Sequence, residues 1–126
     1  MNSLKLFIHN YINDFSKGDV KYIISYYHFP LTIVDRHNKK NAISVIKNVK
    51  QFKNYFNKLY KVLKVIHGYK KTKIIKIRSI NENKNFSSVK VIASRINYKN
   101  KNFKNLELTY YVKKIKNEYS FFCFVT

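Results

Sequence analysis

The N-terminal segment has the hydrophobic pattern of a helix. From Leu4 to Phe15 apolar residues recur every third or fourth position, which is the spacing of one buried helix face. Ser3 can cap the start of this helix, and Gly18 suits its end because glycine adopts the left-handed conformation found there. We therefore expect an amphipathic helix between these two residues.

A second, shorter helix is expected to begin at Asp19, another good N-cap residue. Its buried side would comprise Val20, Ile23, Ile24 and Tyr27. Pro30 would end this helix, because proline disfavours helical conformation in the residue before it. The apolar, β-branched run Leu31–Val34 then predicts a strand, and a short strand is expected around Ala42–Val45.

The clearest helical pattern lies between Val49 and Ile66. Its apolar positions are Val49, Phe52, Phe56, Leu59, Leu63 and Ile66. Lysines occupy the other side, and Gly68 marks the end. This pattern predicts a long, half-buried third helix.

After Gly68 the pattern changes to the alternation that is typical of strands. The expected strands are Thr72–Ile80, Phe86–Tyr98, Leu106–Ile115 and Tyr119–Thr126, separated by asparagine-rich turns. No repeat or linker interrupts the 126 residues, so we expect one domain over residues 1–126. The helices are expected early in the chain and the antiparallel strands late. This order predicts an α+β fold with three helices packed on one face of an antiparallel sheet.

The last two expected strands carry apolar residues on both faces. Alternation places Leu106, Leu108, Tyr110 and Val112 opposite Tyr111, and Tyr119, Phe121, Cys123 and Val125 opposite Phe122 and Phe124. A strand that is apolar on both sides is normally covered on both sides. Because the helices cover only one face, we expect a second copy of the chain on the other, in a two-fold homodimer.

The charge of the chain is strongly basic, with 26 Lys and Arg against 6 Asp and Glu and a net charge of +20. Such a balance indicates an anionic partner such as nucleic acid. The abundance of Lys, Asn and Ile and the scarcity of Gly also match A/T-rich codon usage, and the lysines are spread along the whole chain. We therefore favour a generally solvated basic surface, with nucleic-acid binding as the less favoured alternative.

The remaining composition excludes several classes of protein. The single cysteine, Cys123, rules out a disulfide framework and suits a reducing compartment. No apolar run approaches the roughly 20 residues of a membrane span, so we expect a cytoplasmic protein with no membrane association. With only two glycines, the chain has no glycine-rich phosphate-binding loop. The histidines are scattered, so we expect neither a metal nor another cofactor.

Two stretches of the sequence resemble a known superfamily. The segment Tyr11–Asp19, which ends in a Gly-Asp pair, resembles the end of the first helix in the nuclear transport factor 2-like (NTF2-like) superfamily, which includes ketosteroid isomerases, scytalone dehydratase and SnoaL-like polyketide cyclases. The segment Ile23–Asp35 is similar to the second helix and first strand of that superfamily. The resemblance implies a cone-shaped fold of order α-α-β-β-α-β-β-β-β, in which a curved antiparallel sheet encloses three helices and an apolar pocket. It also implies dimerisation through the sheet.

The same resemblance implies candidate catalytic residues. In ketosteroid isomerases an Asp of the first strand moves a proton on carbon, while a Tyr of the first helix and a protonated Asp of a late strand bind the enolate oxygen. By resemblance, Asp35 stands at the position of the base and Tyr11 at that of the phenol. The late stretch Leu106–Val112 offers Glu107 and Thr109 but no Asp, so the third group has no counterpart here.

Each candidate also has a structural interpretation. Tyr11 lies on the same stripe as Ile8 and Phe15, where a core tyrosine is expected. Asp35 follows a strand, where an aspartate side chain commonly forms a turn. His28 could act as an acid or base near neutral pH, or simply lie at a helix end or loop.

Arg95 shares strand parity with Val89, Val91 and Ala93, which would point it into the pocket. A buried guanidinium requires an anionic partner. This partner would be Glu107 across the hairpin, or the carboxylate or phosphate of a ligand. The other residues expected to line the pocket are Phe15, Tyr27, Phe56, Thr109 and Tyr111.

Two functions follow from these observations. The first is an apolar pocket for a small molecule, with Asp35, Tyr11 and His28 supporting cofactor-free proton transfer, dehydration or cyclisation. The second is a noncatalytic binding or assembly module whose basic surface holds an acidic protein or nucleic acid. Both an enzyme and a binding module remain open at this point.

Overall fold

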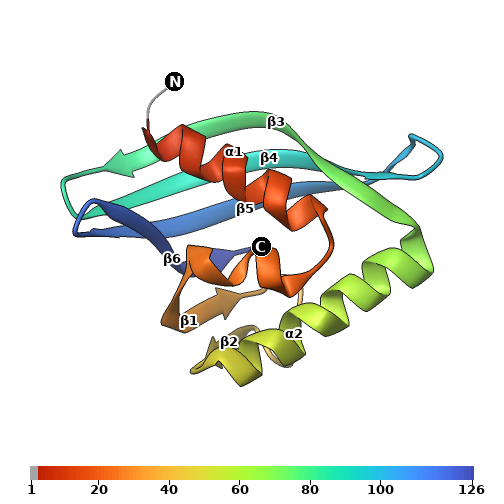
Figure 1. Cartoon of the computed structure of the whole chain (residues 1–126), viewed down its shortest axis with the longest axis horizontal. Helices are drawn as coiled ribbons and strands as arrows, with labels where there is room; N and C mark the ends of the chain where they lie inside the picture. The colour runs from red at the N-terminus through yellow and green to blue at the C-terminus, as the bar shows by residue number, and fades with distance from the viewer. Residues whose placement is uncertain (1–2) are drawn as a thin grey trace.

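The computed structural model describes residues 3–126 and contains a mixed sheet of six strands (Figure 1). The strands are β1 Tyr27–Val34, β2 Ile43–Ile46, β3 Tyr69–Glu82, β4 Phe86–Asn97, β5 Asn102–Ile115 and β6 Glu118–Val125. Their order in the sheet is β2-β1-β6-β5-β4-β3. The sheet is not wholly antiparallel as expected, because β1 runs parallel to β6. These two strands are far apart in the sequence, so no hairpin joins them and forces them to be antiparallel.

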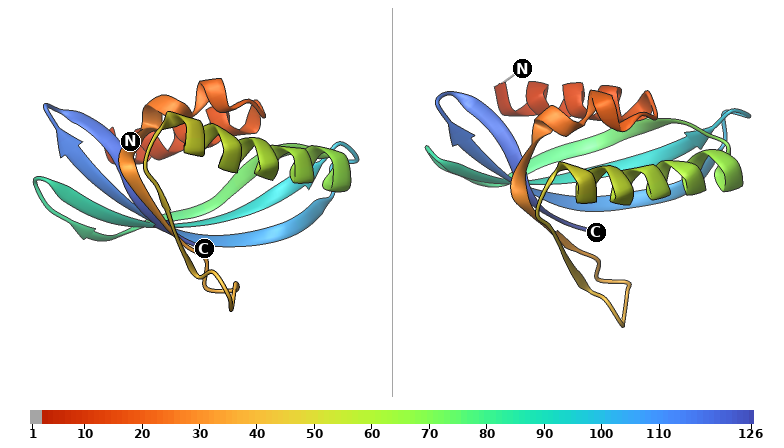
Figure 2. Two further views of the ribbon diagram at one scale, coloured as in Figure 1. Left: turned by 90° about the horizontal axis from the view of Figure 1, so that it is seen from below. Right: turned by 60° about the horizontal axis from the view of Figure 1, so that its bottom comes forward.

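Two helices pack on one side of the curved sheet, as Figure 2 shows. Helix α1 comprises Ser3–Ser16, and α2 comprises Val49–Lys61 and continues into one π-helical turn, η3, Val62–Ile66. No described element covers the other side of the sheet. This arrangement confirms the expected α+β class, and no helix within residues 3–126 is long and apolar enough to cross a membrane.

The expected second helix is replaced by two short 3-10 turns, η1 Val20–Tyr22 and η2 Ile24–Tyr26. Asp19 caps the first of them as expected, since its side chain accepts a hydrogen bond from the Lys21 N–H at 3.0 Å. The chain then enters β1 already at Tyr27, and Pro30 lies inside this strand. The pairing of β1 with β6 is interrupted between Tyr27 and Thr32. Pro30 lies in this interruption, where its lack of an N–H group costs the sheet no hydrogen bond.

The hydrophobic core follows the predicted helical stripes. Helix α1 buries Leu4, Ile8, Tyr11, Ile12 and Phe15, and α2 with η3 buries Phe52, Phe56, Tyr60 and Leu63. The two ends of the third helical pattern are not buried, since Val49 is 44% and Ile66 68% exposed. The π-helical turn accounts for Ile66, because an extra residue per turn rotates the stripe away from the core.

A β-bulge changes which side chains of β6 face the core. Val112 of β5 pairs with Phe121, whereas its neighbour Tyr111 pairs with Cys123, so Phe122 is an extra residue. Consequently Phe121 and Phe124 are both buried, at 0% and 7% exposure. The expected strict alternation of β6 was wrong, because a bulge reverses the parity of every residue after it.

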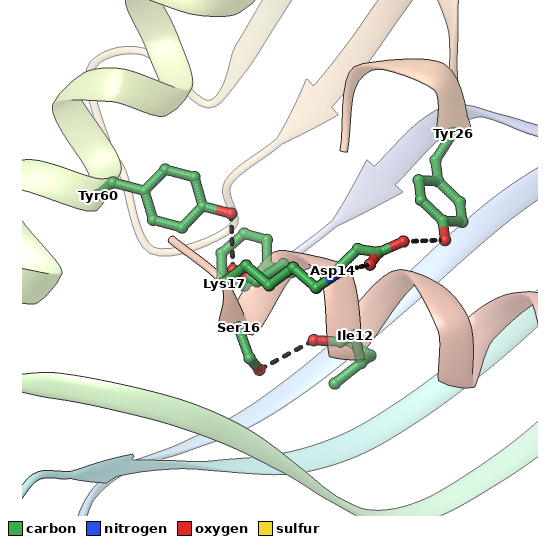
Figure 3. Close-up of polar contacts among 7 residues, drawn as sticks. Ile12, Asp14, Ser16, Lys17, Tyr26 and Tyr60 are labelled. Carbon is green, nitrogen blue, oxygen red and sulfur yellow. Dashed lines mark hydrogen bonds and ion pairs between the residues drawn. The ribbon is translucent and has the colours of Figure 1, made fainter. Parts of the chain in front are cut away.

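The end of α1 is fixed to its neighbours by polar contacts (Figure 3). The Tyr60 hydroxyl of α2 donates a hydrogen bond to the Phe15 carbonyl at 2.8 Å. Asp14 accepts a hydrogen bond from the Tyr26 hydroxyl at 2.5 Å and pairs with Lys17 at 2.9 Å. Both contacts lower the pKa of Asp14, and together these interactions hold α1, η2 and α2 in a fixed arrangement above the sheet.

The basic residues include a row on the edge strand β3. Its members are Lys71, Lys73, Lys76 and Arg78, all exposed. Charges on an edge strand discourage pairing with the sheet of another molecule. This row therefore has a structural explanation that does not require a nucleic-acid partner.

Candidate functional site

A cavity of about 330 Å³ lies between the helices and the inner face of the sheet. Most of its wall is apolar and comes from three elements. Helix α1 contributes Tyr11 and Phe15, α2 contributes Tyr55, Phe56 and Leu59, and β5 contributes Leu106, Leu108 and Tyr110. Its volume is within the range of small-molecule sites.

Arg95 places a positive charge in this apolar cavity. It lies on β4 with Lys104 of β5 as its cross-strand neighbour, and both residues line the cavity. The Arg95 Nε is buried and has no hydrogen-bond partner among residues 3–126. Burial lowers the pKa of the guanidinium from its ordinary value, and nearby tyrosine hydroxyls oppose this effect only in part.

The expected ion pair between Arg95 and Glu107 does not form. The register of the β4–β5 hairpin places Glu107 opposite Ile92 and Arg95 opposite Lys104. Because residues 92 and 95 point to opposite faces of the strand, Glu107 is directed away from Arg95, and it contacts Lys90 instead. Within residues 3–126, no carboxylate forms an ion pair with Arg95.

Tyr11 lines the cavity and is also part of the core. Its ring lies 4.7 Å from that of Phe121, and its hydroxyl is hydrogen-bonded to the hydroxyl of Tyr27. Burial is the main cause that raises the pKa of Tyr11 well above its ordinary value, and the nearby Tyr27 and Tyr110 add to this effect. The phenol is therefore neutral, and it already has a hydrogen-bond partner.

Asp35 lies at the end of β1, and it lines the same cavity as Tyr11. Its Oδ1 accepts a hydrogen bond from the His37 N–H at 3.0 Å, which forms a tight turn, and a second from the Thr126 hydroxyl at 3.3 Å. The carboxylate therefore has a structural role, and its position beside the cavity gives a ligand access to it.

Comparison with known proteins identifies the family. Residues 3–126 match the sequence profile of a family described as NTF2-like protein (DUF6841). The chain belongs to this NTF2-like family. The resemblance found in the sequence is thereby confirmed, whereas no curated protein matches the chain.

Solved structures show the same fold at very low identity. An NTF2-like protein of unknown function from Pseudomonas putida is 7% identical with a TM-score of 0.75, over 97% of this chain and 81% of that one. A Nostoc punctiforme protein with a cystatin-like fold and unknown function is 11% identical with a TM-score of 0.73, over 97% and 85%. A Shewanella frigidimarina protein named a "putative ketosteroid isomerase" is 8% identical with a TM-score of 0.67, over 94% and 89%. At these identities the likeness concerns the fold alone.

Four residues expected at the site of this NTF2-like domain do not line the cavity: His28, Tyr27, Thr109 and Tyr111. Thr109 and Tyr111 flank Tyr110, which points inward, so alternation directs both to the outer face of β5. His28 similarly follows the inward-pointing Tyr27. Tyr27 itself lies behind the cavity wall. Its ring centroid is 4.9 Å from that of Phe52, and its hydroxyl is hydrogen-bonded to the hydroxyl of Tyr11.

The NTF2-like cavity also contains residues that sequence reasoning missed, chiefly Tyr55 and Lys104. Tyr55 lies three residues after Phe52 and four before Leu59, so helical spacing could have identified it as the edge of the buried stripe. Lys104 becomes a cavity residue only through its register with Arg95, which no local pattern reveals. Among residues 3–126, no three His, Cys, Asp or Glu side chains come together to hold a metal ion.

Proposed function

We propose that this NTF2-like domain binds a small, largely apolar molecule that carries a carboxylate or phosphate group. The observation that carries the proposal is the Arg95 guanidinium, whose Nε is buried without a partner in the wall of the cavity. Burying a cation without a counter-charge costs free energy. An anionic ligand would supply the missing charge and could accept two parallel hydrogen bonds from the guanidinium.

The rest of the cavity supports the same ligand chemistry. Its aromatic and aliphatic wall suits an apolar body, and Lys104, the cross-strand neighbour of Arg95, adds a second positive charge. A volume of about 330 Å³ lies at the small end of the range for ligand sites, which suits a small molecule.

Cofactor-free proton transfer is a second candidate function, favoured by the position of Asp35 and Tyr11 at one cavity. Three contacts weigh against it. The Asp35 carboxylate already accepts bonds from His37 and Thr126, and the Tyr11 hydroxyl is bonded to Tyr27. We therefore place binding before catalysis.

The ligand chemistry can be tested by titration calorimetry with four eight-carbon probes: octanoate, octyl phosphate, octan-1-ol and octylammonium. The two anions are expected to bind one to one, and the alcohol and the cation are expected to bind at least about tenfold more weakly, because they cannot neutralise Arg95. Arg95→Met should abolish the preference for anions. Arg78→Met, which removes an exposed arginine of β3, is the matched control and should retain it.

Two results would contradict the proposal. One is equal binding of all four probes, and the other is an anion preference that persists in Arg95→Met. Either would show that the buried guanidinium does not select the ligand.

We also propose that a second copy of the chain covers the outer face of the sheet. Phe86 and Tyr111 are 54% and 37% exposed there, and both rings lie next to Phe122, at 6.1 and 6.5 Å. An exposed aromatic patch of this kind is typical of protein interfaces. Light scattering at micromolar concentration should give twice the 15.2 kDa mass of the chain, and a monomer would refute the dimer.

A further inference from the structure

A second hollow adjoins the cavity. It is an open groove of about 590 Å³ between β2 and α2. Its apolar residues are Val45, Ile46, Tyr55, Leu59 and Val62, and its polar residues are Gln51, Asn54 and Lys58. No carboxylate lines the groove within the described part of the chain.

The groove and the cavity share two residues, Tyr55 and Leu59. These lie one turn apart on α2 and form the boundary between the two hollows. Tyr55 is 36% exposed and Leu59 is half-buried, so the boundary is at the surface. A ligand in the cavity that extends past these two side chains would reach the groove.

The groove leaves apolar surface in contact with water. Val45 is 49% exposed and Val62 45% exposed. Exposed apolar surface that continues from a cavity mouth is typical of ligand-binding grooves. An alkyl chain would cover these side chains at a gain of about 0.8 kcal/mol for each buried methylene.

The two hollows have complementary chemistry. The cavity carries the unpaired guanidinium of Arg95, whereas the groove is lined mainly by aliphatic and aromatic carbon. A ligand that satisfies both has a charged head and a long apolar tail. The opposite orientation would place the tail against Arg95 and the charged head beside Lys58, an exposed cation that water already solvates.

We infer that the ligand is a long-chain acid, whose carboxylate or phosphate head binds Arg95 and whose alkyl tail passes Tyr55 and Leu59 into the groove between β2 and α2. This inference rests on the proposed function and extends it, because it assigns the groove to the same ligand and fixes the ligand as an amphipathic acid longer than the cavity.

The experiment compares octanoate with dodecanoate by titration calorimetry, both below their micelle concentrations. Complete burial of four more methylenes at about 0.8 kcal/mol each corresponds to a gain in affinity of roughly 200-fold. Since the groove is open on one side, we expect dodecanoate to bind at least about tenfold more tightly than octanoate.

Variants separate the groove from the cavity. Val45→Lys and Val62→Lys should reduce dodecanoate binding to near that of octanoate, because a charged side chain disfavours the tail, while octanoate binding should stay within about twofold of the parent. Val65→Lys is the matched control: it adds the same charge to the same helical segment at a residue that is 76% exposed and does not line the groove. This variant should retain the full preference for dodecanoate.

The outcomes distinguish the two proposals. Equal binding of the two acids, or a chain-length preference that both groove variants retain, would overturn the inference. If octanoate still binds through Arg95 in that case, the proposed function stands. Failure of both acids to bind would overturn both.

Discussion

Replacing Phe121 by Ala is expected to lower the free energy of unfolding by about 3–5 kcal/mol, as is typical for deletion of a buried phenyl ring. Phe121 is 0% exposed, and its ring lies 4.7 Å from the rings of both Tyr11 and Tyr110 and 5.0 Å from that of Phe7. Its loss would leave a cavity where α1 meets the sheet. Urea unfolding followed by circular dichroism measures the change.

The neighbouring residue provides a matched control. Phe122 is the extra residue of the bulge and lies on the outer face beside Phe86 and Tyr111, so Phe122→Ala should cost no more than about 1 kcal/mol. Both proteins should be compared at a concentration where the oligomeric state is the same. Similar losses for the two variants would mean that the bulge does not divide these residues between the two faces.

Replacing Arg95 by Met is expected to stabilise the protein and to abolish its binding of anions. Met provides an apolar stem and removes a largely buried charge that forms no ion pair with any carboxylate of residues 3–126. Replacing buried ionic groups by apolar ones commonly stabilises proteins by about 1–4 kcal/mol. We expect a gain of about 1–2 kcal/mol, because Arg95 is not fully removed from water.

This gain would be the sign of a residue kept for function at the expense of stability. The control Arg78→Met changes an exposed residue and should alter the free energy of unfolding by no more than about 0.5 kcal/mol. A loss of more than about 1 kcal/mol in Arg95→Met would instead show that the guanidinium stabilises the fold.

The helices and the element order could be predicted because they depend on local periodicity. The stripe from Leu4 to Phe15 defines the buried face of α1, and the same spacing locates α2. The prediction of a second helix was wrong because a cap and four apolar residues do not show whether the next turn continues as helix. There, the pairing of Tyr27 with Phe121 in the sheet takes the chain into β1 instead.

The candidate site was only partly predictable, because it depends on strand register. Alternation correctly placed Arg95 with Val89 and Val91, since these residues share one strand without an intervening bulge. The cross-strand neighbour of Arg95 depends on the register between β4 and β5. This register places Lys104, and not Glu107, opposite Arg95, and no local sequence pattern predicts it. A shift in register at the bulge likewise explains why Phe124 was assigned to the wrong face.

The central claim, that the Arg95 guanidinium binds the anionic group of a ligand, is tested most directly by nuclear magnetic resonance. The chain contains three arginines, Arg36, Arg78 and Arg95, so an ¹⁵N-labelled sample has only three Nε–H signals, and Arg95→Lys identifies the relevant one. Titration with octanoate should shift the Arg95 Nε–H signal in saturable, one-to-one fashion and leave those of Arg36 and Arg78 in place. An Arg95 signal that stays unchanged while octanoate binds, or equal shifts at all three arginines, would contradict the account.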